Sequence, residues 1–217
     1  MRFKYSDDEI KGILNKMVVI FDTREQANDH IVDWFIKNKH PYKEEMIPYG
    51  DYSCYLPVGS FEGQLRDIYF TDEIVLERKF CIDELAMNFK DHKININEVT
   101  QEIIDLLGEK YLKKVLKTDY NRLKSELAHL NKYDIQFFIL MEDKNYDENI
   151  RLGRFRAKYD KETLYKRTKA LEREFRTMIR PTDKSVMGSE IYNTLKYEVR
   201  NILKNKGFIE MEGEESE

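Results

Sequence analysis

The sequence predicts an α/β domain in which a mixed central sheet is flanked by helices. Short apolar runs of strand length alternate along the chain with longer segments whose apolar residues recur every three or four positions. Residues 17–21 and 135–141 are the most compact apolar runs, and we expect both to be buried strands. The 217 residues contain neither a repeat nor a clear linker, so one domain is the simplest prediction.

The first half of the chain is predicted to alternate helices with short strands. Ser6 followed by Glu9 is a capping-box pattern, which predicts a helix with Ile10 on its buried face. Helical spacing of apolar residues from Ile31 predicts a second helix, which ends near Pro41. Further strands are expected at 44–47, 52–56, 67–70 and 74–78, with a loop at 57–63 and a tight turn at 71–73.

The second half is predicted to be mostly helical. A helical pattern follows Asp83 for some fifty residues, and residues 88–117 form a helical insertion. After the strand at 135–141 comes a basic loop at 151–160. Two helices then close the chain, the first reaching Ile179 and the second covering 191–202. We therefore predict one domain over 1–207 and an acidic, disordered tail over 208–217.

Composition excludes several classes of protein. Charged residues make up 36% of the chain and apolar residues 41%, which is typical of a soluble globular protein. No apolar run approaches the roughly 20 residues that a membrane span needs, and the first residues lack the apolar core of a signal peptide. Cys54 and Cys81 form no metal-type pair, and we interpret them as reduced thiols of a cytoplasmic protein. The four scattered histidines argue against a zinc site.

Positive charge is concentrated in one segment of an otherwise acidic chain. The net charge is −4, but residues 151–184 hold twelve Lys or Arg against five Asp or Glu. Such a segment is either a solvated helix face or a surface that contacts phosphate. Under the second interpretation the candidate nucleic-acid contacts are Arg151, Arg154, Arg156 and Lys158.

Acidic residues lie at the predicted ends of several strands. Asp22 and Glu25 follow the first buried strand, and Asp51 begins a middle strand. Glu77 and Lys79 end the next strand, and because they are two residues apart their side chains point to one face, with that of Arg78 on the other. Carboxylates that converge from adjacent strands suit Mg²⁺, and a lysine beside them can orient a water molecule and neutralise developing charge. The alternative is a strand that simply reaches water.

Three short motifs together resemble one nuclease family. They are VIFDTRE at 19–25, GDY at 50–52 and LERKFCID at 76–83, each beside a predicted strand. In this order they are similar to the GD…ERKxxxD signature of the XPF-type nuclease family, which belongs to the restriction-endonuclease-like PD-(D/E)xK superfamily. The resemblance covers most of residues 16–203, and it is specific as a set rather than motif by motif.

The resemblance implies a restriction-endonuclease-like fold and a Mg²⁺-dependent DNA endonuclease, with Mn²⁺ as a substitute, acting at forks, flaps or other single-strand/double-strand junctions. It also implies roles for individual residues. Asp51 and Glu77 would be the principal metal ligands, and Asp22 and Glu25 would line the same pocket, with Asp22 as a further ligand. Lys79 would be the catalytic lysine, and Asp83 would orient Lys79 or a water molecule of the metal site. Arg24 and Arg78 would brace carboxylates or contact phosphate.

The chain also departs from the family pattern. About thirty extra residues follow the ERKxxxD motif, and no helix-hairpin-helix signal is present. The chain is most similar to short stand-alone members from phages or mobile elements, which would act in a bacterial cytoplasm on DNA, as a homodimer or with a protein partner. The second hypothesis is a catalytically silent member that binds DNA or a protein. Structural alternatives are an Arg78–Asp83 ion pair, Glu25 as a helix-terminal charge and Asp51 as a turn residue.

Overall fold

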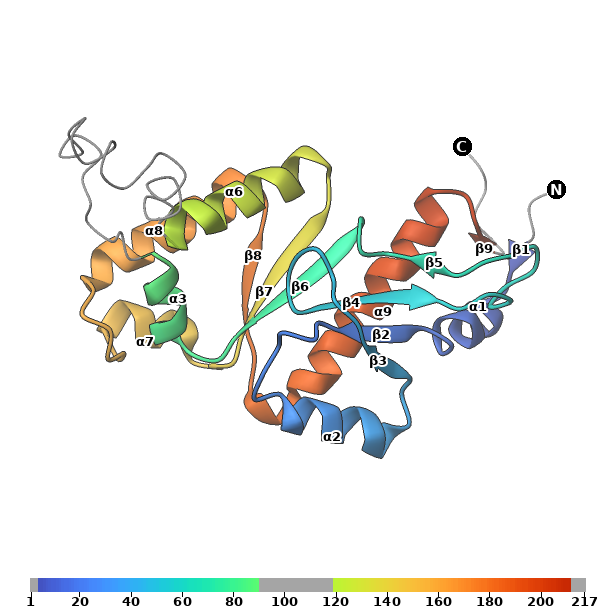
Figure 1. Cartoon of the computed structure of the whole chain (residues 1–217), viewed down its shortest axis with the longest axis horizontal. Helices are drawn as coiled ribbons and strands as arrows, with labels where there is room; N and C mark the ends of the chain where they lie inside the picture. Colours follow the sequence, from blue (N-terminus) through green and yellow to red (C-terminus); the bar gives the residue numbers. More distant parts are fainter. Residues whose placement is uncertain (1–3, 90–118, 212–217) are drawn as a thin grey trace, which may run out of the picture.

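A seven-stranded mixed sheet forms the centre of the protein (Figure 1). The structure is a computed structural model that describes residues 4–89 and 119–211, so most of the expected insertion lies outside the described residues. The strand order is β3-β2-β4-β6-β7-β8, with β5 paired to β4. The bounds are β2 Val18–Phe21, β3 Tyr42–Glu44, β4 Tyr52–Leu56, β5 Ile68–Tyr69, β6 Ile74–Lys79, β7 Gln136–Met141 and β8 Met178–Pro181.

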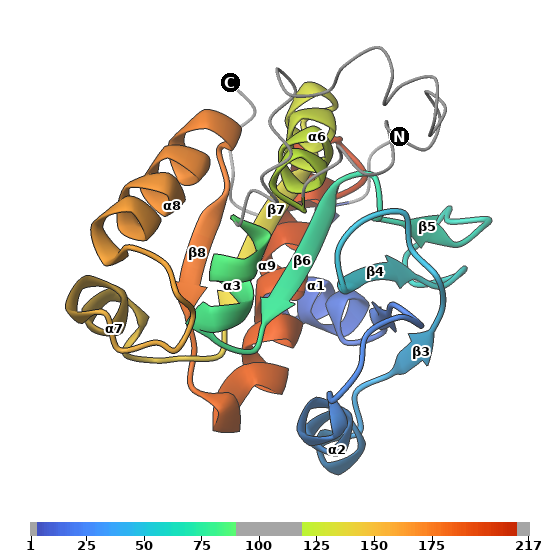
Figure 2. The ribbon, with the colours of Figure 1, turned by 60° about the vertical axis from the view of Figure 1, so that its left-hand side comes forward.

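Helices cover both faces of this sheet, which confirms the predicted fold class (Figures 1 and 2). One face packs against α1 (Asp7–Leu14), α2 (Asp29–Asn38) and α9 (Met187–Asn205). The opposite face packs against α3 (Ile82–Asn88), α6 (Asp119–Lys132), α7 (Tyr146–Leu152) and α8 (Lys161–Phe175). Among the described helices none is long and apolar enough to cross a bilayer.

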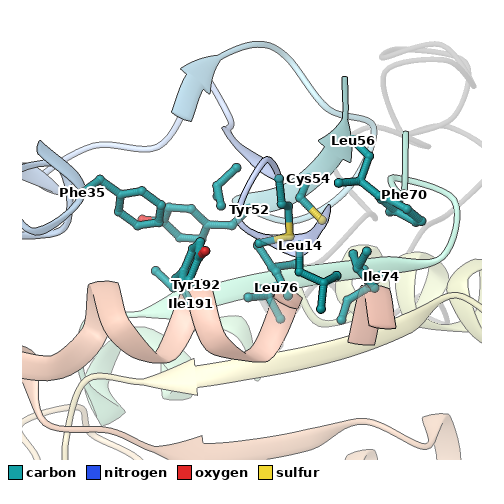
Figure 3. Packing of buried hydrophobic residues seen from close by; sticks show 14 of the residues in the cluster. Leu14, Phe35, Tyr52, Cys54, Leu56, Phe70, Ile74, Leu76, Ile191 and Tyr192 are labelled. Carbon is teal, nitrogen blue, oxygen red and sulfur yellow. The ribbon is translucent and has the colours of Figure 1, made fainter. Parts of the chain in front are cut away.

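The first core lies between the sheet and α1, α2 and α9. Leu14, Tyr52, Leu76 and Ile191 gather there from four different elements, and none is more than 3% exposed (Figure 3). Burying a large apolar side chain contributes about 1.5–3 kcal/mol. This core therefore fixes β4 and β6 firmly against the helices.

Alternation along β6 divides its side chains between the two cores. Leu76 belongs to the first core, whereas Val75 belongs to the second, with α3, α6 and β7. Because side chains of a strand alternate between faces, Glu77 and Lys79 continue on the face of Val75. Arg78 continues on the face of Leu76. The packing of the apolar half of β6 thus decides where its charged half points.

Several predicted elements differ from those observed. Ile179 lies in β8 rather than in a helix, because α8 ends at Phe175 and Arg176 takes a left-handed conformation (φ 53°). Ile179 then pairs in parallel with Ile139 of β7. The short helix α7 was not expected. The strand expected at 44–47 is β3, at Tyr42–Glu44.

Described secondary structure extends beyond the predicted boundary at residue 207. Ile209 is 2% exposed and belongs to the first core. Strand β9 (Glu210–Met211) pairs in parallel with β1 (Lys4–Tyr5), so the start of the described chain and its end lie side by side. Residues 208–211 are therefore structured rather than part of a disordered tail, and the rest of the predicted tail, from residue 212 onward, lies outside the described residues.

Candidate active site

The ends of three strands meet at one edge of the sheet. The backbone amide of Asp22, directly after β2, donates to the carbonyl of Asp51 at 2.8 Å. The amide of Asp51, directly before β4, donates to the carbonyl of Leu76 in β6, also at 2.8 Å. Two backbone hydrogen bonds therefore fix Asp51 between β2 and β6. The structure thus brings Asp22, Asp51 and Glu77 to the same edge, as the motif order predicted.

Gly50 allows Asp51 to approach β6 this closely. It has φ +65°, a conformation that residues with a side chain rarely adopt. A Cβ atom at this position would lie 2.2 Å from Val75 Cγ1 and 2.8 Å from the Leu76 carbonyl oxygen. Asp51 Oδ2 then accepts a hydrogen bond from the Arg78 amide at 2.7 Å. Only glycine fits here, so the Gly50-Asp51 pair acts as one positioning unit.

Lys79 lies on the face of Glu77, as the strand period predicted. Its Nζ is 2.5 Å from Glu77 Oε1 and 3.3 Å from Glu84 Oε1, and the residue is 7% exposed. Burial lowers the pKa of Lys79, but the negative charges of Glu77 and Glu84 outweigh burial and raise this pKa above its usual value. Lys79 is therefore a buried ammonium group that two carboxylates hold in place.

A cleft of about 510 Å³ opens beside these residues, between the sheet edge and α6. Burial, followed by the charge of Glu77 and that of Glu25, raises the pKa of Asp51 well above its usual value. Burial and the charge of Glu77 also raise the pKa of Glu126, which accepts a hydrogen bond from the Gly50 amide. The lining residues are Asp22, Arg24, Pro48, Tyr49, Gly50, Asp51, Glu77, Arg122, Ser125, Glu126 and His129. This crowding of carboxylates favours a bound cation.

The donor set is compatible with a magnesium ion. In the part of the chain that the structure describes, no three His, Cys, Asp or Glu side chains are already gathered as a complete metal-binding group. Magnesium does not require one, because it commonly binds through one or two carboxylates and keeps several waters. Asp51 and Glu77, which both line the cleft and are close enough for their charges to interact, meet that requirement.

Asp22 has no lone pair left for a metal ion in this arrangement. Its Oδ1 accepts from the Arg24 amide (2.8 Å) and Arg24 Nε (2.7 Å). Its Oδ2 accepts from Arg24 Nη2 (2.9 Å) and the Ile47 amide (2.9 Å). Burial alone would raise the pKa of Asp22, but these hydrogen bonds outweigh burial and lower the pKa below its usual value. Asp22 therefore braces the wall of the cleft together with Arg24, and the expectation that it is a metal ligand does not fit this geometry.

Arg78 and Glu25 lie in a separate network on the opposite face of β6. Arg78 Nη2 is 2.6 Å from Glu25 Oε1, and its Nη1 is 3.2 Å from Glu142 Oε2. His30 Nε2 lies 2.5 Å from Glu142 Oε1. The side chains of Arg78 and Glu142 are 5% and 1% exposed. Glu25 is thus an ion-pair partner of Arg78 rather than part of the cleft lining.

Asp83 contacts the basic loop instead of Lys79. Its Oδ1 accepts hydrogen bonds from the backbone amides of Arg156 (2.6 Å) and Ala157 (2.5 Å). The position beside Lys79 that the resemblance implied for Asp83 is taken by Glu84. The Arg78–Asp83 ion pair considered as an alternative is therefore not formed. Asp83 ties the basic loop to α3, which begins three residues after Lys79.

The four candidate DNA contacts in the basic loop are all exposed side chains, and Arg24, the fifth candidate, lines the cleft. Arg151 stacks on the Tyr165 ring at 4.7 Å and donates to its hydroxyl group at 2.8 Å. Arg154 Nη1 lies 2.7 Å from Glu148 Oε1. Arg156 and Lys158 flank the backbone segment that Asp83 anchors. These residues form a basic surface next to α3 rather than a part of the cleft lining.

Sequence reasoning missed the residues that α6 contributes. Arg122, Ser125, Glu126 and His129 recur at helical spacing and all line the cleft. The same spacing is visible in the sequence, but the prediction used only the apolar stripe of this helix. Glu84 was missed because its partner, Lys79, belongs to a different element. A polar stripe on a helix that faces a predicted site is the signal that could have found the first group.

Comparisons with known proteins concern the fold. No protein-family model matches the sequence, and no curated protein matches it either. Among solved structures the chain is similar to XPF from Aeropyrum pernix, with 16% identity over 83% of this chain and 60% of that chain, at a TM-score of 0.49. A second similar structure is XPF from Aeropyrum pernix in complex with DNA, with 16% identity, 85% and 66% coverage and a TM-score of 0.47. The chain spans less than two thirds of either relative, so the site itself must carry the functional argument.

Proposed function

We propose that the chain is a metal-dependent DNA endonuclease that hydrolyses phosphodiester bonds at junctions of single- and double-stranded DNA. The observation that carries the proposal is the convergence of Asp51, Glu77 and Lys79 at one sheet edge, beside an open cleft. On the opposite face both carboxylates, Glu25 and Glu142, are ion-paired with the buried Arg78, and neither lines the cleft. Here four carboxylates line an open cleft together with two arginines, and the cleft is large enough to admit a phosphate group. The junction preference comes from the family that the motifs resemble.

Each residue has a defined task in this proposal. Asp51 and Glu77 would hold Mg²⁺, with Mn²⁺ as a substitute. When bound, the ion would stabilise charge developing on the phosphate and make a water molecule more acidic. Lys79 would place a positive charge beside Glu77, where the negative charge of the phosphate increases in the transition state. Gly50 and Arg78 act through backbone contacts that fix Asp51, and Asp22 and Arg24 keep the cleft wall in place.

The basic loop would bind the duplex that flanks the cleaved bond. Arg151, Arg154, Arg156 and Lys158 are exposed, and Asp83 fixes their loop to the helix that follows Lys79. Phosphate contacts of this kind dominate affinity and make it depend on salt. We expect Arg154→Glu combined with Arg156→Glu to weaken DNA binding and to reduce its salt dependence. Unchanged affinity in this double variant would remove the basic loop from the proposal.

The deciding experiment is a cleavage assay on defined DNA structures. Labelled 3′-flap, 5′-flap, fork, nicked, single-stranded and duplex DNA would be incubated with the protein in Mg²⁺, in Mn²⁺ or in chelator. We expect cleavage of junction substrates that requires metal and disappears in Lys79→Ala and in Asp51→Asn. If the protein binds these DNAs but cuts none of them with either metal, the catalytically silent scaffold is correct instead.

A further inference from the structure

Three aromatic rings form a row that begins inside the cleft and leaves it. Tyr49 and His129 both line the cleft, and their ring centres are 5.1 Å apart. The His129 ring is in turn 4.5 Å from that of Tyr133, just beyond the end of α6. Tyr133 is 57% exposed, and His129 is exposed as well. His129 and Tyr133 therefore present ring surface to the solvent, whereas Tyr49 is half-buried and also packs against the second core.

The row starts next to the candidate metal ligand. Tyr49 precedes Asp51 by two residues, which places the two within about 7 Å along the chain. Gly50 between them is fixed by its positive φ and its tight contact with Val75 and Leu76. A group stacked on Tyr49 would thus lie within about two or three nucleotides of a phosphate at Asp51, since stacked nucleotides repeat every ~3.4 Å.

Cationic groups border the same row. The Arg24 side chain lines the cleft and is 61% exposed while it holds Asp22. Lys132 Nζ lies 5.2 Å from the centre of the Tyr133 ring. Aromatic faces combined with positive charge are the chemistry by which proteins bind single-stranded nucleic acid, because rings stack on bases while cations meet phosphates.

A comparison with the other tyrosine beside Asp51 argues against a purely structural role. Tyr52 is fully buried in the first core, and its hydroxyl group lies 3.4 Å from Glu25 Oε1. Tyr49 instead faces the cleft and contacts a ring from α6. Core packing accounts for Tyr52 and for the buried part of Tyr49, but not for the exposed rings of His129 and Tyr133 that continue the row.

We propose that Tyr49, His129 and Tyr133 form a stacking surface for unpaired bases of the strand that is cut. The occupant is unpaired because a base within a duplex already has neighbours on both faces, whereas an unstacked base offers a free face. The inference rests on the proposed nuclease function for its orientation relative to the cut. It assigns to this site a single-stranded segment that leaves the cleft along the end of α6.

The test measures binding in the absence of metal, so that it does not depend on cleavage. Fluorescent oligothymidylate and a blunt duplex of equal length would be titrated with protein in chelator and followed by anisotropy. We expect Tyr133→Ala and His129→Ala each to weaken single-strand binding by about fivefold to a hundredfold, the range for loss of one stacked base. Affinity for the blunt duplex should change by less than about twofold in both variants, because a duplex is held through its phosphates.

Two controls make the result specific. Tyr133→Phe keeps the ring and should bind the single strand like the unaltered protein. Tyr197→Ala removes a tyrosine of similar exposure (62%) from α9, on the opposite face of the sheet, and should have no effect. Unchanged single-strand binding in Tyr133→Ala, or an equal loss for both DNAs, would overturn the stacking surface even if the protein cuts DNA. Selective loss would support it even if no cleavage is found.

Discussion

Arg78 and Lys79 are consecutive buried cations, yet their side chains lie on opposite faces of β6 and in different surroundings. Arg78 is enclosed by Glu25 and Glu142 under the helices of the first core. Lys79 shares its face with Glu77, which lines an open cleft. For both residues burial lowers the pKa, and nearby carboxylates raise it more strongly. A perturbed pKa therefore does not separate a structural cation from a catalytic one. The difference is that Glu77, the partner of Lys79, lines an open cleft, whereas Glu25 and Glu142, the partners of Arg78, do not.

The sharpest test of this difference is the removal of Lys79. We expect Lys79→Ala to slow single-turnover cleavage at saturating protein by about 10²- to 10⁴-fold, because the charge beside the reacting phosphate is lost. Lys144→Ala, which removes a 65% exposed lysine, should leave the rate unchanged. If Lys79→Ala kept full activity, Lys79 would be a structural cation like Arg78, and its assignment as the catalytic lysine would be wrong.

Removing Arg78 should instead affect stability. We expect Arg78→Met to lower the free energy of unfolding by about 3–5 kcal/mol, because two buried carboxylates lose their counter-charge. Urea unfolding at constant pH measures this loss. Arg200→Met is the matched control: its partner Asp7 is 83% exposed, and such surface pairs contribute only about 0–1 kcal/mol. If Arg78→Met lowered the free energy of unfolding as little as the control does, the ion pairs of Arg78 with Glu25 and Glu142 would not be important for stability.

The effect of Asp51→Asn on thermal stability should depend on metal: the variant should be more stable than the unaltered protein in chelator, but it should gain no stability from Mg²⁺. The pKa of Asp51 is raised in the folded state, so its ionisation destabilises the fold as the pH rises through that pKa. In chelator at neutral pH, Asp51→Asn should therefore stabilise the protein by about 1 kcal/mol, which raises the melting temperature by about 2–4 °C. Added Mg²⁺ should raise the melting temperature of the unaltered protein but not that of Asp51→Asn. An equal response of both proteins to Mg²⁺ would count against Asp51 as a ligand.

Asp83→Ala should have the smallest effect and should act on DNA affinity. Loss of the two hydrogen bonds to the basic loop is expected to weaken duplex binding by about two- to tenfold, with little change in the single-turnover rate. Asp83→Asn retains an acceptor oxygen and should bind DNA normally. A large loss of rate at unchanged affinity would return Asp83 to the role beside Lys79 that the family resemblance implied.

The sequence was sufficient for features that depend on local periodicity. The common face of Glu77 and Lys79 follows from the period of a strand, and the Gly50-Asp51 pair could be found from its motif. The sequence could not predict that hydrogen bonds occupy all the acceptor positions of the Asp22 carboxylate, because one donor is the Ile47 amide, 25 residues away. Strand β8 was hidden because Phe175 and Ile179 are four residues apart, a spacing that a helix would share. In the structure, the left-handed backbone conformation of Arg176 ends α8 and so places Phe175 and Ile179 in different elements.

The position of α9 in the chain has a consequence for the order of synthesis. This helix supplies Ile191, Leu195, Val199 and Leu203 to the core that holds β2, β4 and β6, yet it begins only at Met187, long after these strands in the chain. At about 5–20 residues per second, the segments that carry Asp22 and Asp51 wait roughly ten to thirty seconds for α9 to leave the ribosome. We therefore expect the cleft of a nascent chain to become organised only after α9 has been made and has packed against these strands.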